Sequence, residues 1–91
     1  MKELYAIVRG RVQGVYFRNF VRAQAERLGV AGEARNAQDG TVHITAQGEE
    51  EKLRTLLPLL SEGSPESSVE LVSVTWRALE RRMEGFSVTH D

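Results

Sequence analysis

The chain has 91 residues and a formal net charge of −1, with 41% apolar and 27% charged side chains. This length and ordinary globular composition exclude a multidomain enzyme, a collagen-like repeat and a wholly disordered chain, and they predict one domain spanning residues 1–91. The absence of cysteine excludes zinc ribbons, thiol nucleophiles and disulfide scaffolds.

Charge is distributed unevenly along the chain. Basic residues outnumber acidic ones in residues 1–36, and the reverse holds from residue 37 onward. A local basic region in a nearly neutral protein favours a small anion site over a nucleic-acid surface, because nucleic-acid-binding domains are usually basic overall. No apolar run approaches the roughly 20 residues that cross a bilayer, and the N-terminus lacks a signal-peptide core. We therefore expect a cytoplasmic protein.

The first two predicted elements are a strand and a helix. Residues 3–9 form an apolar run that ends at Gly10, which is typical of a buried strand. From Phe17 the apolar positions are three or four apart as far as Leu28, and Gly29 then supplies a helix stop. The spacing predicts an amphipathic helix.

A hairpin and a second helix come next. Residues 30–37 and 41–47 flank the turn 38–40, whose Asp-Gly pair is a strong hairpin signal. Leucines repeat at helical spacing after the acidic run 49–51, whose negative charge suits a helix N-terminus. Pro58 is expected to kink the last turn of this helix or to move it to a looser connection.

The last third of the chain predicts a polar loop over residues 63–68 and two strands. Apolar and polar residues alternate through residues 69–79, which predicts a long strand whose buried face carries Trp76. The same alternation in residues 86–88 predicts a short final strand. The element order is the ferredoxin-like split βαβ plan (βαββαβ), an α+β fold with two helices packed on one face of an antiparallel sheet. Right-handed crossovers place the first and third predicted strands side by side at its centre.

The connection between the first strand and the first helix, residues 10–18, reads Gly-Arg-Val-Gln-Gly-Val-Tyr-Phe-Arg. Two glycines before a helix can turn successive backbone amides inward, and the helix N-terminus adds unpaired amides and a positive dipole end. Arg18 stands at the helix start, where its planar guanidinium can bind two oxygens of one phosphate. On spacing alone an ordinary turn with solvated arginines is favoured, because the run matches neither the Walker nor the Rossmann pattern.

Residues 10–18 also resemble the signature of the acylphosphatase family at every defined position, and residues 32–48 resemble its second signature. The resemblance extends over nearly the whole chain. It implies hydrolysis of the carboxyl–phosphate bond of small acyl phosphates to carboxylate and inorganic phosphate, with Arg18 and a water-orienting Asn36 as catalytic residues. The phosphate-binding residues that it implies are Val12, Gln13, Gly14, Val15, Tyr16, Phe17 and Arg18.

Some positions depart from the family pattern without affecting Arg18 or Asn36. Glu33 stands where many members have a large aromatic residue, Ala34 stands where they have valine, and the tail 89–91 lacks the frequent aromatic or basic ending. These differences concern packing beside the site more than the activity. Without the resemblance, Asn36 would be interpreted as a strand-edge residue that supports the hairpin.

Other polar residues are weaker candidates for a site. His43 alternates with buried residues and is assigned to the open face of the sheet, whereas His90 is assigned to a frayed tail. Two separated histidines do not make a metal site. No metal and no other cofactor is expected.

The sequence therefore predicts a monomeric acylphosphatase that takes a small acyl phosphate and binds inorganic phosphate or sulfate, with no nucleic-acid or membrane partner. Two alternatives stay open. One is a noncatalytic ferredoxin-like binding module, although residues 41–45 offer no aromatic side chain for stacking RNA bases. The other is a homologue that keeps the loop but serves a carbamoyl-phosphate pathway in a complex.

Overall fold

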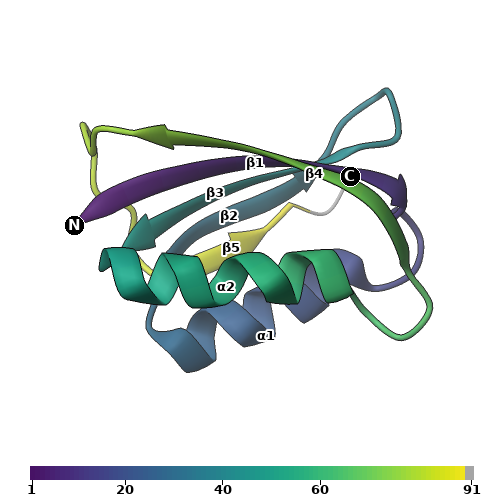
Figure 1. The fold of residues 1–91 in the computed structure, drawn as a ribbon, viewed down its shortest axis with the longest axis horizontal. Helices are drawn as coiled ribbons and strands as arrows, with labels where there is room; N and C mark the ends of the chain where they lie inside the picture. Colours follow the sequence, from purple (N-terminus) through teal and green to yellow (C-terminus); the bar gives the residue numbers. More distant parts are fainter. Residues whose placement is uncertain (90–91) are drawn as a thin grey trace.

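The chain forms one sheet backed by two helices. A computed structural model describes residues 1–89, and the elements follow the predicted order (Figure 1). His90, predicted to lie in a frayed tail, is outside the described residues. The elements are β1 (Lys2–Arg11), α1 (Phe17–Leu28), β2 (Ala31–Asn36), β3 (Val42–Gly48), α2 (Glu50–Glu62), β4 (Ser68–Arg77) and β5 (Phe86–Val88).

The strands within residues 1–89 form a five-stranded sheet in the order β4-β1-β3-β2-β5. β1 pairs antiparallel with β3 and with β4, which confirms the expected central pair, and β2 pairs antiparallel with β3. β5 is parallel to β2, so the sheet is mixed and not wholly antiparallel. The connection 78–85 explains this difference, because it leaves one edge and re-enters at the other. β5 therefore runs against β4 and with β2 (Figure 1).

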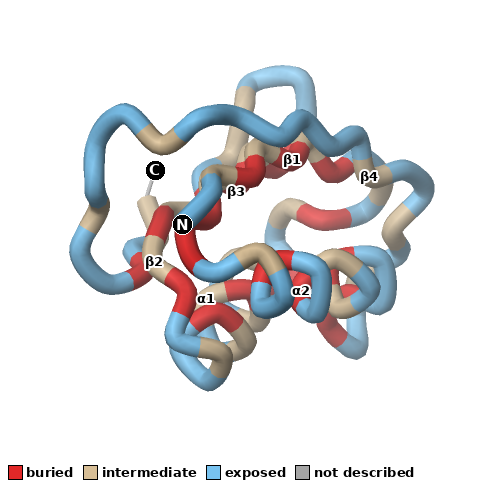
Figure 2. Tube along the Cα trace, turned by 60° about the vertical axis from the view of Figure 1, so that its left-hand side comes forward, coloured by how far each residue is buried: buried red, intermediate tan, exposed pale blue. Residues whose placement is uncertain are grey.

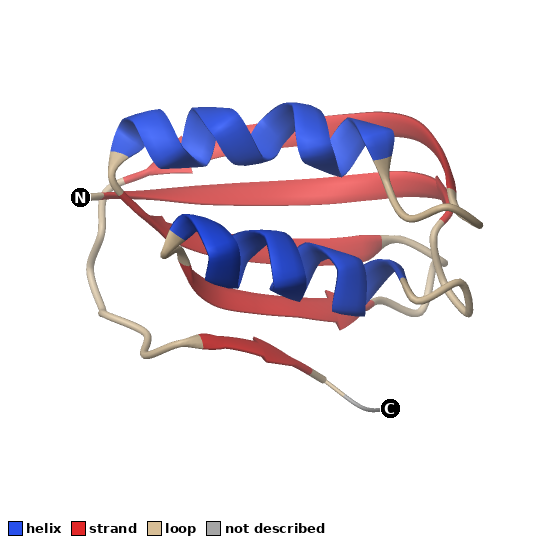
Figure 3. Ribbon diagram, turned by 90° about the horizontal axis from the view of Figure 1, so that it is seen from below, coloured by secondary structure: helices blue, strands red, loops and turns tan. Residues whose placement is uncertain are grey.

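Both helices cover the same face of the sheet, as predicted, and the core lies between the two layers (Figure 3). Figure 2 shows buried segments along this interface and exposed ones on the outer sides of the helices. Alternate residues of the central strands and one stripe of each helix supply the core. Its fully buried side chains include Leu4, Ala6, Val8, Val21, Ala25, Val42, Ile44, Ala46, Leu53, Leu56 and Leu60.

β1 continues through Gly10 instead of ending there. Its register with β4 shifts between Arg9 and Gly10, and the φ of Gly10 is +128°. A Cβ atom at Gly10 would lie 2.2 Å from the carbonyl oxygen of Ser68. Glycine is therefore required for the close approach of the two strands, and it marks a bulge where the sequence suggested a stop.

α2 runs through Pro58 and ends at Glu62, so its last turn is not replaced by a looser connection. Leu56 and Leu60 on either side of Pro58 are both fully buried. Their burial holds the last turn against the sheet although Pro58 cannot donate a backbone hydrogen bond. Within residues 1–89, neither helix is long and apolar enough to span a bilayer.

β4 departs from the buried face predicted for it. Val74 and Trp76 are 37% and 36% exposed, although they pair with the buried Ala6 and Leu4 on β1. β4 is an edge strand, so the two helices cover its inner face only in part. The expectation that Trp76 belongs to the core is wrong. The guanidinium carbon of Arg54 lies 5.1 Å from the centroid of its ring system instead.

Candidate active site

The loop between β1 and α1 is shaped by the side chains that it buries. Val12, Val15 and Phe17 are almost fully buried, whereas Tyr16 is 73% exposed. Gly14 and Tyr16 have φ angles of +75° and +60°, and the residue between them does not have a positive φ. Such alternation curls a backbone so that successive amides face one concave side. The buried side chains fix this curl against the core.

α1 begins at this loop without a side-chain cap. Tyr16 occupies the N-cap position in a left-handed conformation and makes no capping hydrogen bond, and the first turn holds no acidic residue. Among residues 1–89, the first amides of the helix therefore have no capping side-chain acceptor, and they carry the positive end of the helix dipole. This combination suits an anion.

A pocket of about 320 Å³ opens where the loop, the start of α1 and β5 meet. Five of the seven predicted phosphate-binding residues line it, and Gln13 and Val15 do not. Two further lining residues escaped sequence analysis: Asn19 follows Arg18 directly, whereas no motif points to the distant Val88. The pocket is lined by Val12, Gly14, Tyr16, Phe17, Arg18, Asn19 and Val88.

Arg18 is oriented by the residue that follows β5. Its guanidinium donates to the carbonyl oxygen of Thr89 and lies 3.5 Å from the Thr89 hydroxyl. The amide of Thr89 in turn donates to the carbonyl oxygen of Ala34, at 3.1 Å. Arg18 is thus linked through Thr89 to β2, the strand that ends at Asn36.

Asn36 lies at the end of β2, on the same side of the sheet as the buried Ala34. Its side-chain oxygen Oδ1 is buried and accepts no hydrogen bond from the described residues. Leaving a buried acceptor unpaired costs about 1–3 kcal/mol, so such an atom calls for a polar partner. Asn36 does not line the pocket.

Gln13 joins the loop to the β2–β3 hairpin through its side chain. Its Nε2 atom donates to the carbonyl oxygens of Ala37 and Thr41, at 2.8 and 3.0 Å. The same hairpin is closed by the Ala37 amide, which donates to the Thr41 carbonyl oxygen at 2.8 Å. The side chain of Gln13 therefore contacts the segment that follows Asn36.

Ser64 holds the other side of the loop. Its buried hydroxyl donates to the carbonyl oxygen of Val15 at 2.9 Å. The carbonyl oxygen of Ser64 accepts from the amide and the hydroxyl of Ser67, at 3.0 and 2.7 Å. The connection after α2, which looked like an ordinary polar loop, thus helps to fix the β1–α1 loop.

Acidic residues are absent from the loop and from the start of α1, since none lies between Arg9 and Glu26. Asp39, in the hairpin, accepts hydrogen bonds from the Thr41 hydroxyl and amide at 2.6 and 3.1 Å. These two bonds hold the pKa of Asp39 below its usual value. Among residues 1–89, no three His, Asp or Glu side chains are grouped as a metal site would need.

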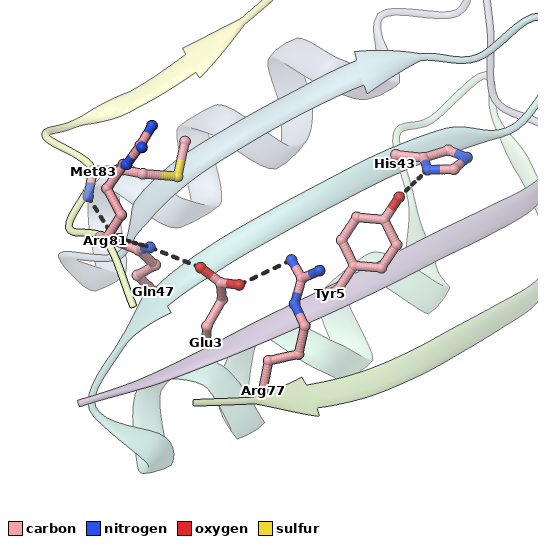
Figure 4. Close-up of polar contacts among 7 residues, drawn as sticks. All are labelled: Glu3, Tyr5, His43, Gln47, Arg77, Arg81 and Met83. Carbon is pink, nitrogen blue, oxygen red and sulfur yellow. Dashed lines mark hydrogen bonds and ion pairs between the residues drawn. The ribbon is translucent and has the colours of Figure 1, made fainter. Parts of the chain in front are cut away.

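The face of the sheet away from the helices carries a separate polar network (Figure 4). The buried side-chain amide of Gln47 donates to the Glu3 carboxylate and accepts from the Met83 amide, both at 2.8 Å. The Tyr5 hydroxyl is hydrogen-bonded to Nδ1 of His43. His43 therefore lies on the open face, as its alternation predicted.

The α+β fold thus brings an uncapped helix N-terminus, a curled loop and an arginine together at one pocket. The family model for acylphosphatase matches residues 4–88. The chain belongs to the acylphosphatase family and is a hydrolase.

Individual relatives agree with this assignment. An acylphosphatase of Dehalococcoides mccartyi (strain CBDB1) is 42% identical over 88 residues, which cover 96% of this chain and 97% of that protein. The crystal structure of an acylphosphatase from Bacillus subtilis superposes with a TM-score of 0.95 at 39% identity, covering 99% of this chain and all of the other. An acylphosphatase from Coxiella burnetii superposes with a TM-score of 0.90 at 34% identity, over 97% and 92% of the two chains.

Proposed function

We propose that the pocket holds the phosphate half of a small acyl phosphate, and that Arg18 and Asn36 carry out hydrolysis of its carboxyl–phosphate bond. The loop of residues 12–17 contributes its amides, Arg18 its charge, and Asn36 its side-chain oxygen. The observation that carries this proposal is the convergence of the curled loop, the uncapped start of α1 and Arg18 on one pocket.

Phosphate recognition follows from the groups around the pocket. The loop amides and the first amides of α1 supply dipoles aimed at an oxyanion, and a guanidinium can bind two phosphate oxygens at once. The contact with Thr89 orients Arg18 at the pocket wall. Inorganic phosphate and sulfate carry the same oxygens, so both are expected to bind here.

The chemical step needs few additional groups. A carboxylate leaves without protonation, so the enzyme has to place water in line with phosphorus and neutralise charge on the equatorial oxygens. The Oδ1 atom of Asn36 is buried and accepts no bond within the described chain, and it can accept a hydrogen from the attacking water. An amide is too weak a base to keep that proton. The proton therefore passes to a phosphate oxygen.

The expected setting is a single domain, acting as a monomer in the cytoplasm. The net charge of −1 favours a small substrate over a nucleic acid. Tyr16, at the pocket rim, is 73% exposed. The acyl group would extend past it toward solvent, so we expect broad tolerance of the acyl part.

The test is hydrolysis of benzoyl phosphate by the purified protein, with inorganic phosphate as a competitor. Turnover that phosphate inhibits competitively is expected, and Arg18→Gln should lower kcat/KM by at least about 100-fold. Arg27→Gln is the matched control, because Arg27 is exposed near the end of α1 and does not line the pocket. Binding of phosphate without turnover of benzoyl phosphate would contradict the roles proposed for Arg18 and Asn36.

A further inference from the structure

We propose that Gln13 is a positioning residue, which sets the place of Asn36 relative to the phosphate loop. The proposal rests on the water-orienting role of Asn36 given above. The sequence placed Gln13 among the phosphate-binding residues, but Gln13 does not line the pocket. Its side chain turns to the segment directly after Asn36.

Within residues 1–89, the end of β2 is paired with another strand on one side only. Asn36 pairs with Val42 of β3 on its inner side. Among residues 1–89, the pairing with β5 on the outer side reaches Ala34, whose carbonyl oxygen accepts from the amide of Thr89. Asn36 lies two residues beyond this part of the pairing.

The side chain of Gln13 supplies a second support from the loop. Both hydrogens of its amide nitrogen are used, one on the Ala37 carbonyl and one on the Thr41 carbonyl. Ala37 is bonded covalently to Asn36, and Thr41 lies across the hairpin from Ala37. A shift of the hairpin relative to the loop would break both bonds. The side chain of Gln13 therefore joins the loop directly to the hairpin beside Asn36.

The chemistry of this contact requires a donor with two hydrogens. The two carbonyl oxygens also accept from hairpin amides, Ala37 from Gly40 and Thr41 from Ala37. Removing Gln13's amide thus leaves neither oxygen unpaired, so the hairpin itself should survive. What is lost is the connection between loop and hairpin.

The experiment is a double-mutant cycle on the full chain with benzoyl phosphate as substrate. Gln13→Met keeps an unbranched side chain of similar length but has no donor, and Gln13→Ala serves if the methionine variant does not fold. We expect kcat to fall about 10- to 100-fold, because a misplacement of the order of 1 Å can cost about 100-fold. KM and the Kd of inorganic phosphate should change less than about threefold.

The cycle separates positioning from a general loosening of the site. In an Asn36→Ala background, Gln13→Met should lower kcat no further, because there is no side-chain oxygen left to misplace. Ser64→Ala is the matched control: Ser64 holds the loop at Val15 and has no bond to the hairpin. Its effect should be the same in both backgrounds.

Two outcomes would overturn the inference. A Gln13→Met loss that adds in full to that of Asn36→Ala would show that Gln13 acts independently of Asn36. A rise in the phosphate Kd of Gln13→Met that accounts for its whole loss of activity would show that Gln13 acts in phosphate binding, as the sequence predicted. If Asn36→Ala itself left kcat unchanged, the role proposed for Asn36 would fail first, and the cycle would show this directly.

Discussion

Arg18 and Asn36 bring different kinds of group to the proposed reaction. Arg18 supplies a guanidinium that is always charged and that donates a hydrogen bond to the carbonyl oxygen of Thr89. Asn36 supplies a neutral acceptor that has no bond from the described chain. A charge next to phosphate acts in the ground state and in the transition state alike, whereas an acceptor for water acts only once water attacks. The effects of the two residues on phosphate binding and on turnover should therefore be separable by measurement.

Arg18→Gln and Asn36→Ala are expected to separate binding from turnover. Arg18→Gln should weaken phosphate binding roughly 10- to 100-fold, since a hydrogen bond to a charged group is worth about 1.5–3 kcal/mol, and should also lower kcat. Asn36→Ala should lower kcat by about 100-fold and keep the phosphate Kd. Calorimetric titration with phosphate and benzoyl phosphate kinetics measure the two quantities.

Controls for this comparison come from the same elements. Gln38→Ala removes an exposed side-chain amide from the same hairpin as Asn36, so it should leave both quantities unchanged. Arg27→Gln repeats the loss of charge at the far end of α1. Loss of phosphate binding in a folded Asn36→Ala protein would contradict the water-orienting role.

His43 should give the folded state a measurable dependence on pH. Burial against the sheet, followed by the charge of Arg35, lowers the pKa of His43 below its usual value of 6.5. As the pH falls through 6.5, the unfolded chain takes up a proton that the folded chain resists, so the free energy of unfolding decreases. This contribution is fully present above pH 6.5 and is lost on acidification toward the folded pKa.

The measurement is urea unfolding at about pH 7.5 and about pH 5.5, for the natural sequence and for His43→Gln. The natural protein should lose more stability between the two pH values, because the variant lacks this titration. Equal losses in the two proteins would show that His43 has the same pKa folded and unfolded. Comparing the loss of stability in the two proteins removes the contribution of all other titratable groups, because both proteins contain them.

The sequence could indicate Arg18 and Asn36 but not what orients them. Two short motifs, residues 10–18 and 32–48, point to these residues, because each motif is continuous in the sequence. The partners come from elsewhere: Thr89 is 71 positions from Arg18, and Ser64 is 49 positions from Val15. Such contacts depend on tertiary packing and leave no periodic trace in the chain.

At the scale of elements, alternation predicts which residues share a face but not whether anything covers that face. β3 and β4 both alternate, yet β3 is central and buries its inner face, whereas β4 is an edge strand and leaves Val74 and Trp76 partly exposed. Strand position follows from the global topology. The burial of β4 could therefore not be predicted from its own residues.

Gly32 is expected to be the glycine on which the β2–β3 pairing depends most. Its φ is +146°, and a Cβ atom there would lie 1.8 Å from the carbonyl oxygen of Thr45 on β3. Gly32→Ala should cost roughly 2–3 kcal/mol or more, since backbone strain alone costs about 1–3 kcal/mol and the clash forces the strands apart. Urea unfolding measures the loss.

Gly40→Ala is the matched control for this prediction. Gly40 also has a positive φ, of +89°, but a Cβ atom there would meet nothing within 4 Å. Its substitution should therefore cost only the backbone strain, about 1 kcal/mol. Equal losses at Gly32 and Gly40 would mean that the close approach of β2 to β3 contributes nothing.

For the whole molecule, the element order brings together the two segments of the proposed site. Once β1 and β3 are central and both crossovers are right-handed, the β1–α1 loop and the β2–β3 hairpin emerge at the same end of the sheet (Figure 1). The arrival of the chain after β5 at this end was not predictable from any motif. It depends on the connection 78–85, which is fastened to the open face by Gln47.

Activity should survive exhaustive chelation, because the chain offers its own positive groups and the described residues that line the pocket include no carboxylate. Enzymes that transfer phosphoryl groups commonly use Mg²⁺ held by carboxylates near the phosphate. No acid lies between Arg9 and Glu26, and Glu33 lines a groove on the open face with Thr45 and Gln47, opposite the buried Ala34. In the proposed reaction, Arg18 and the helix amides take the electrostatic role that a cation would otherwise have.

The measurement is benzoyl phosphate hydrolysis before and after dialysis against EDTA, and again after Mg²⁺ is restored. The three rates should agree within about twofold, since carboxylate departure needs no Lewis acid and Arg18 is always charged. Arg18→Gln sharpens the comparison: if Mg²⁺ can substitute for the lost guanidinium, it should raise the low rate of this variant and leave the natural protein unchanged. A natural-protein rate that falls to background in EDTA and returns with Mg²⁺ would assign charge neutralisation to a metal, and Arg18 would then be left with substrate binding alone.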